Sequence, residues 1–188
     1  MSAIDDLLDP IKLPLMLPVR QHFERPVLHN LEASIAESVR AGGYLQALRP
    51  GQTVAISAGS RGISNLALVI RTLVREVRAA GADPFVFPAM GSHGGATASG
   101  QILVLKELGI SEESVGMPIR ASMDTVLVGT TPGGLPAYTD RIASEADGII
   151  LLNRVKAHTQ FRGAYESGLL KMLAIGLGKQ RGAECCHR

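Results

Sequence analysis

The chain has 188 residues, which suits one ordinary domain, and 46% of them are hydrophobic, as is usual in a globular protein. Its net charge of +2 is too small to indicate nucleic-acid binding, and no basic cluster is interleaved with aromatic residues. No apolar run reaches membrane-spanning length, and the acidic N-terminal segment lacks a signal-peptide pattern. The two cysteines, Cys185 and Cys186, are adjacent, so we expect no disulfide framework and a cytoplasmic location.

The first half of the chain is predicted to contain an arm, two helices and a buried strand. Residues 1–30 are aperiodic and interrupted by prolines, which indicates an arm or a short edge strand. Residues 31–48 have the pattern of a helix weakened by two glycines, and residues 52–58 (QTVAISA) that of a buried strand. Ser64 is the expected N-cap of a long amphipathic helix that ends at Gly81.

The middle of the chain is predicted to contain a strand, a helix and then a pair of strands. Residues 84–90 (PFVFPAM) predict a strand, and Thr97 is the expected N-cap of the helix that follows it. Residues 123–130 and 135–138 predict two strands joined by a turn at a Gly-Gly pair.

The last third adds a short helix, a strand and a longer helix. Residues 140–145 predict the short helix, and the apolar run 147–153 is of the kind found in sheets covered on both faces. Residues 166–179 have the pattern of a mostly apolar helix. Because strands alternate with helices, we predict that residues 31–188 form a Rossmann-like three-layer α/β sandwich with a mainly parallel sheet.

Three predicted strands lead into loops rich in functional groups: AGSRGIS, MGSHGGAT and NRVKAHTQFRG. The carboxyl ends of parallel strands meet at one edge of the sheet, where ligands bind. We therefore expect Arg61, His93 and His158 to lie around one crevice.

Each of these loops also has an ordinary interpretation. Arg61 either sits in a solvated glycine turn or binds a carboxylate or phosphate at the start of the next helix. His93 is a candidate acid/base group beside exposed backbone N–H groups, and His158 lies between two possible anion binders, Lys156 and Arg162.

Lys171 stands in the middle of the apolar stretch ESGLLKMLAIGLGK. Small residues on its face would let another backbone or a flat ligand approach. A desolvated lysine there could act as a nucleophile, whereas the alternative is a snorkelling lysine on a half-buried helix. On an α-helix the neighbours on this face are Ser167, Gly168, Ala174, Ile175 and Gly178.

Three segments, MGSHGGAT, ADGIILLNRVKAHTQFRG and ESGLLKMLAIGLGKQRGA, together resemble the N-terminal domain of the lactate racemase family, the nickel-pincer nucleotide enzymes. The similarity runs from about residue 15 to the end of the chain and is closest to the little-characterised branch of racemase homologues. The resemblance implies a second, C-terminal domain of similar size that is absent from this chain.

The resemblance also implies a cofactor and residue roles. Lys171 would hold pyridinium-3,5-bisthiocarboxylic acid mononucleotide nickel through a thioamide bond, and His187 would complete the square-planar nickel. His93 and His158 would be alternating acid/base groups on opposite faces of the substrate, and Arg61 would bind the substrate.

The implied activity is racemisation or epimerisation of a 2-hydroxy acid by hydride transfer, with Ser167 and Gly168 as cofactor-binding residues beside the attachment point. Two other hypotheses remain open from the residues. One is a non-catalytic α/β module that binds a nucleotide or phosphate. The other is a zinc or iron site built from His187 and the two cysteines beside it.

Overall fold

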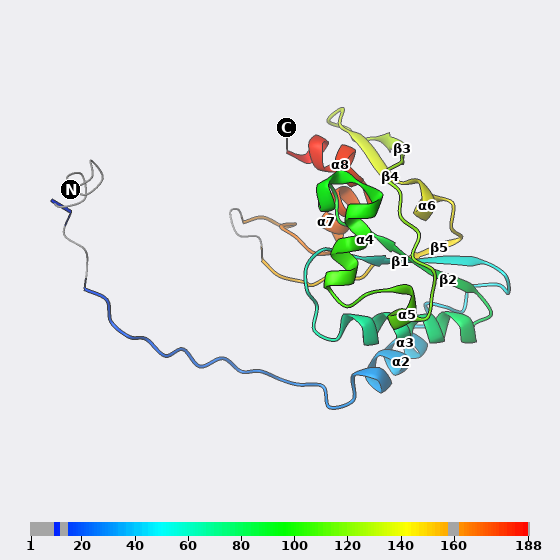
Figure 1. The fold of residues 1–188 in the computed structure, drawn as a ribbon, viewed down its shortest axis with the longest axis horizontal. Coiled ribbons are helices and arrows are strands. Elements are labelled where there is room, and N and C mark those ends of the chain that lie inside the picture. The colour runs from blue at the N-terminus through cyan, green and yellow to red at the C-terminus, as the bar shows by residue number, and fades with distance from the viewer. Residues whose placement is uncertain (1–9, 12–14, 158–161, 188) are drawn as a thin grey trace.

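The computed structural model describes residues 10–11, 15–157 and 162–187 of the chain. At its centre lies a three-stranded parallel sheet in the order β2-β1-β5 (Figure 1). The strands are β1 (Thr53–Ala58), β2 (Asp83–Pro88) and β5 (Gly148–Ile150). Two of the three strands are almost completely buried, so the sheet forms the core of the domain.

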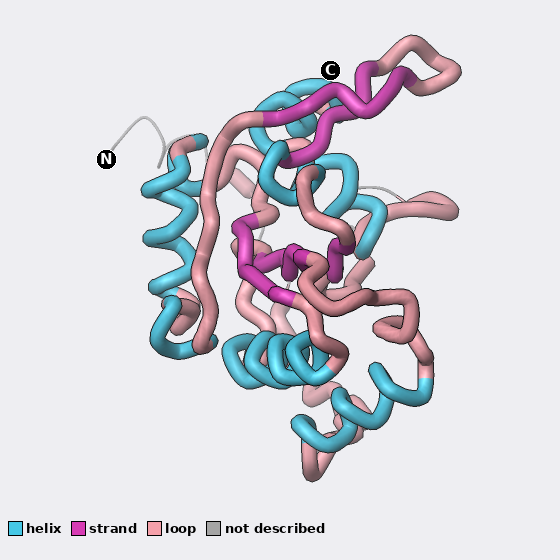
Figure 2. Tube along the Cα trace, turned by 90° about the vertical axis from the view of Figure 1, so that its right-hand side faces the viewer, coloured by secondary structure: helices cyan, strands magenta, loops and turns pink. Residues whose placement is uncertain are grey.

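Successive side chains of β1 point to opposite faces of the sheet and into different layers. Ile56 packs against helix α3 (Leu66–Ala79) on one side. Ala55 packs on the other side with α6 (Arg141–Ser144) and η2 (Met172–Leu177). Helices therefore cover both faces (Figures 1 and 2), and the predicted α/β sandwich is confirmed.

Two shorter helices join α3 on its side of the sheet. These are α4 (Ala98–Glu107), through Leu105, and α5 (Glu112–Val115), through Val115. The side chain of Thr97 accepts a hydrogen bond from the N–H of Gly100 and caps α4 as predicted.

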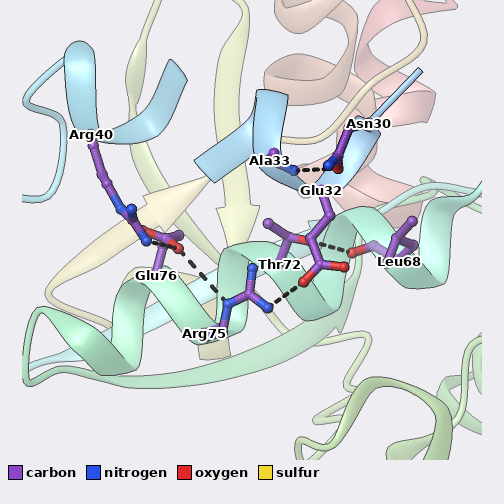
Figure 3. Close-up of polar contacts among 8 residues, drawn as sticks. All are labelled: Asn30, Glu32, Ala33, Arg40, Leu68, Thr72, Arg75 and Glu76. Atoms are coloured by element: carbon purple, nitrogen blue, oxygen red, sulfur yellow. Dashed lines mark hydrogen bonds and ion pairs between the residues drawn. The ribbon is translucent and has the colours of Figure 1, made fainter. Parts of the chain in front are cut away.

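Helix α2 (Leu31–Ala41) packs on the outer surface of α3 and ends earlier than predicted, at the C-cap Gly42. Two ion pairs join the helices (Figure 3). Arg40 binds the buried carboxylate of Glu76 through Nε at 2.7 Å and through the second guanidinium nitrogen at 2.8 Å, and Arg75 binds Glu32. Residues 15–29, before α2, contain no helix or strand and run away from the body of the domain (Figure 1).

The start of α3 differs by one residue from the prediction. Its N-cap is Asn65 rather than Ser64, and Asn65 adopts a left-handed conformation with φ 58°. Asparagine tolerates this conformation better than most residues, and its side chain makes no capping hydrogen bond. The end of α3 agrees with the prediction, since Gly81 follows the C-cap with φ +84°.

Strands β3 (Thr125–Thr130) and β4 (Pro136–Asp140) form an antiparallel pair separate from the central sheet. They match the predicted strand and its return after a glycine turn. The last residue of β4, Asp140, caps α6 because its Oδ1 accepts a hydrogen bond from the N–H of Ala143 at 3.0 Å.

The run 147–153 was predicted as a strand covered on both faces, and this is wrong in extent. Only Gly148–Ile150 forms β5, which is an edge strand, and Ile149 remains 41% exposed. Beyond the strand, the N–H of Leu152 still donates to the Oγ of buried Ser57 at 2.9 Å. The chain therefore stays beside β1 as it enters the loop.

The predicted single helix over 166–179 is broken. It consists of α7 (Leu169–Lys171), the π-helical turn η2, and α8 (Lys179–Cys186). A Cβ on Gly178 would come within 2.3 Å of the carbonyl oxygen of Ala174, so this glycine admits the chain's own backbone rather than a ligand. None of the helices in the described ranges is both long and apolar enough to cross a membrane.

Candidate active site

A cavity of about 340 Å³ opens where β1, β2 and β5 end. Its walls come from four segments: 59–63 after β1, 89–93 after β2, 152–156 after β5, and the C-terminal segment 167–187. In parallel α/β sheets ligands bind at this edge. The sequence prediction of a crevice built from several strand ends therefore agrees with the position of the cavity.

Five of the seven predicted site residues line this cavity. They are Arg61, His93, Ser167, Lys171 and His187. Gly168 does not line it; this glycine is buried beside Asn153 with φ 80° and ψ −145°, a conformation that favours glycine. His158 lies outside the described residues, although Arg154 and Lys156 of the same loop are part of the cavity wall.

His93 is fixed by contacts at its ring and at its backbone. Its Nδ1 lies 2.5 Å from the Oγ of Ser60, which belongs to the loop after β1. Its backbone carbonyl accepts a hydrogen bond from the side-chain Nε2 of Gln101 at 3.3 Å. The loop turns tightly because Gly91 and Gly94 adopt left-handed conformations with φ +61° and +67°. The contact with Ser60 orients the imidazole, and the contact with Gln101 holds the backbone of a residue that lines the cavity.

The charges around the cavity have one sign. Four cationic side chains line it: Arg61, Arg154, Lys156 and Lys171. No aspartate or glutamate is among its described lining residues. Because nearby charges of one sign raise the local concentration of the opposite ion, the arrangement favours an anionic ligand.

Lys171 is exposed at the cavity wall, so the structure does not show the desolvation that would activate it as a nucleophile. The fully buried lysine of this region is Lys179, at the junction of η2 and α8. The π-helical turn also changes which residues share a face. Ile175 lines the cavity as expected, whereas Gly178 is replaced by Met172 and Gly176.

Sequence reasoning missed several lining residues. Ser60 stands beside Arg61 in the loop after β1, but no local pattern predicts its contact with His93. Met172 and Gly176 lie in the π-helical turn η2 and line the cavity, and a Cβ on Gly176 would come within 3.0 Å of the carbonyl oxygen of Ala89. A glycine in an apolar helical stretch was the available signal for a close backbone approach.

The structure does not assemble the metal site that the two cysteines suggested. Cys185 is partly buried and Cys186 exposed, and both are free thiols. Within the described part of the chain, no three His, Cys, Asp or Glu side chains are grouped to hold a metal ion. His187 follows them at the end of α8 and faces the cavity.

The structure defines the chain as a parallel α/β sandwich whose strand ends carry a cavity lined by basic side chains, and this is the edge at which such folds bind small molecules. Comparison with protein families then identifies it more closely. The lactate racemase N-terminal domain matches residues 19–188, and the chain belongs to this family. A search of curated proteins found no match.

Proposed function

We propose that this chain is the substrate- and cofactor-binding N-terminal domain of a nickel-dependent racemase or epimerase of 2-hydroxy acids. The observation that carries the proposal is that Arg61, His93, Lys171 and His187 come from separate segments and line one cavity. The family match supports it independently. The second, C-terminal domain is part of the proposal, as is a cytoplasmic location.

The donor set around the cavity fits the nickel-pincer nucleotide. Lys171 would provide an amine for a thioamide link, and His187 would provide an imidazole, a type of ligand that suits nickel. The volume of about 340 Å³ lies in the range of small-molecule sites, and the cationic lining suits a phosphate. Ser167, beside Lys171, is proposed as a further contact, and Gly168 shapes the turn that leads to it.

Racemisation requires the hydrogen on C2 to leave and return on the opposite face. That C–H bond is not acidic enough for easy proton abstraction, so we propose that its electron pair leaves with the hydrogen as hydride. When bound, the nickel-pincer nucleotide supplies the hydride acceptor. As hydride leaves C2, the hydroxyl proton moves to an imidazole and a C=O bond forms, which gives a transient 2-keto acid.

The residues of this chain have distinct proposed roles in that reaction. The planar guanidinium of Arg61 binds the carboxylate and fixes C2, since its paired N–H donors match two oxygens. His93 takes the hydroxyl proton for one enantiomer, and Ser60 holds its ring. His158, outside the described residues, is proposed to serve the other enantiomer in the same way.

The proposal is tested on the protein that carries both domains, produced together with the enzymes that make the cofactor. Intact mass should show the added mass of the nucleotide, and peptide mapping should place it on Lys171. Chiral chromatography should show interconversion of the enantiomers of a 2-hydroxy acid. Lys171→Ala should lose the adduct and the activity, whereas Lys106→Ala, at an exposed lysine on α4, should keep both. An unmodified Lys171 under these conditions contradicts the proposal.

The basic lining of the cavity also favours a second candidate, a module that binds a nucleotide or phosphate without chemistry. Calorimetry with a mononucleotide and with 2-hydroxy acids separates the two. Tight nucleotide binding that survives His93→Ala, together with no racemisation, favours the binding module.

A further inference from the structure

The side chain of Lys179 is fully buried, with 0% of its surface exposed. Three acceptor oxygens surround its Nζ: the carbonyl of Pro88 at 2.5 Å, the Oε1 of Gln101 at 3.1 Å and the Oδ2 of Asp140 at 2.9 Å. Asp140 is itself fully buried, and its Oδ2 has no hydrogen-bond donor among the described residues apart from this ion pair. Neither the cavity chemistry nor the family match assigns this cluster a role.

The chemistry of the neighbours fixes both the orientation of Gln101 and the charge of Lys179. The Nε2 of Gln101 faces the carbonyl oxygens of Gly91 at 2.8 Å and His93 at 3.3 Å, which can only accept. The Oε1 of the same amide must therefore face Lys179. Three acceptors around Nζ match the three donors of an ammonium group, whereas a neutral amine offers fewer. Burial lowers the pKa of Lys179, and the carboxylate of Asp140 opposes this shift.

Lys179 also has an unusual backbone conformation. Its φ of +53° lies in the left-handed region, where glycine is the favoured residue. A lysine in this conformation carries a local cost, which persists only where surrounding contacts hold the residue. At Lys179 the three contacts of the ammonium group hold the residue in this conformation.

These contacts reach both walls of the cavity. Pro88 ends β2, and Ala89 and Met90, which follow it, line the cavity. Gln101 accepts a hydrogen bond from Lys179 through its Oε1 and donates one to the carbonyl of His93 through its Nε2. Lys179 itself begins α8, whose C-cap is His187, and η2 and Gly178 connect it to α7, which ends at Lys171.

We propose that Lys179, through Gln101, is a positioning residue: its buried ammonium group ties the loop of His93 to the helices that carry Lys171 and His187 and so sets the separation of the two cavity walls. The proposal rests on the proposed function for its catalytic meaning. The geometric part, that Gln101 and Lys179 fix the environment of His93, is independent of it.

The variant that tests the contact between Gln101 and the loop of His93 is Gln101→Glu. A glutamate keeps the size of the side chain and an acceptor for Lys179, but it has no N–H to donate to the carbonyls of Gly91 and His93. A second variant, Lys179→Met with Asp140→Asn, removes both buried charges together, so no unpaired charge is left. Asparagine at 140 keeps an oxygen that can cap α6. Gln46→Glu, at an exposed glutamine outside the cluster, is the matched control.

Two measurements decide the proposal. Proton–carbon correlation spectra of the histidine rings, with His93 assigned through His93→Gln, should show the His93 signal shifted or split in Gln101→Glu and in the double variant. The signals of His22 and His29, exposed before α2, should stay in place, and Gln46→Glu should match the wild type. In the cofactor-loaded two-domain protein, kcat should fall about 10- to 100-fold with little change in KM, because positioning errors near 1 Å have effects of that size.

A folded Gln101→Glu protein with an unmoved His93 signal and unchanged kcat overturns the proposal and makes the cluster purely structural. If Gln101→Glu does not fold, the double variant gives the same decision. If the wild type shows no racemisation, the proposed function fails, while the ring spectra still decide whether Lys179 and Gln101 position His93.

Discussion

The Nδ1 atom of His93 lies 2.5 Å from the Oγ of Ser60, so a hydrogen bond joins the loops after two neighbouring parallel strands, and both residues line the cavity. The two residues are 33 positions apart in the chain. The bond leaves Nε2 as the ring nitrogen directed away from Ser60. Orientation of an imidazole by a partner on one nitrogen is the usual way to prepare the other for proton transfer.

The first prediction concerns this bond. Ser60→Ala should lower kcat for racemisation about 10-fold, because the ring of His93 loses its partner and samples other orientations. The free energy of unfolding should change by about 1 kcal/mol or less, as expected for one exposed hydrogen bond. Steady-state kinetics and urea unfolding measure the two effects. Ser64→Ala, at an exposed serine that does not line the cavity, is the control, and an equal loss of kcat there would contradict the argument.

Arg61 provides the second prediction. Arg61→Lys should raise KM for the 2-hydroxy acid about 10- to 100-fold, since an ammonium group cannot make the paired hydrogen bonds of a guanidinium to a carboxylate. Initial rates over a substrate series measure KM, and calorimetry measures affinity without turnover. Arg20→Lys, at an exposed arginine before α2, should leave both values unchanged. An unaltered KM in Arg61→Lys would show that another group binds the carboxylate.

The third prediction tests the close approach of η2 to the end of β2. A Cβ on Gly176 would lie 3.0 Å from the carbonyl oxygen of Ala89 and 2.5 Å from the Sδ of Met172. Gly176→Ala should therefore destabilise the domain by about 1–3 kcal/mol through overpacking, despite the better helix propensity of alanine. Gly129→Ala, where a Cβ would meet nothing within 4 Å, should have little effect. Chemical denaturation of both variants measures the difference, and equal stabilities would refute the predicted contact.

The fourth prediction is a pH dependence of stability that originates at Glu76. The hydrogen bonds from Arg40 hold the pKa of this carboxyl group below its ordinary value, although its burial acts in the opposite direction. A carboxyl group with a lowered folded-state pKa stabilises the fold above its ordinary pKa, and this contribution is lost as pH falls through the folded-state value. Urea unfolding between about pH 6 and pH 3 should thus show a steeper loss of stability in the wild type than in Glu76→Gln. Parallel curves would show that Glu76 is not responsible.

Much of the fold could be predicted from local patterns. Thr97 and Asp140 cap their helices as residues of these types do, since the acceptor and the N–H it satisfies are three residues apart. The alternation of strands and helices predicted the sandwich. The strand predicted over 147–153 was too long. An apolar run of this kind fits both a fully buried strand and a short edge strand followed by a loop, and periodicity cannot distinguish these two structures.

The candidate site was predicted in part, for a topological reason. Parallel strands bring their carboxyl ends to one edge, so residues after β1 and β2 must lie near each other wherever they are in the chain. This placed Arg61 and His93 together. Gly168 was predicted to bind the cofactor. It lies buried in a turn whose backbone angles are not helical, so its position could not be predicted from helical spacing.

The sequence by itself determined the alternation of strands and helices and which residue types stand at the strand ends, because capping, periodicity and turn chemistry act within a few residues. Tertiary structure alone decided which lysine of the 166–179 segment is exposed and which is buried. Lys171 and Lys179 look alike in the chain, yet the acceptors of Lys179 at Gln101 and Pro88 are 78 and 91 residues away. Contacts at such separations depend on how complete elements pack, and no local pattern encodes them.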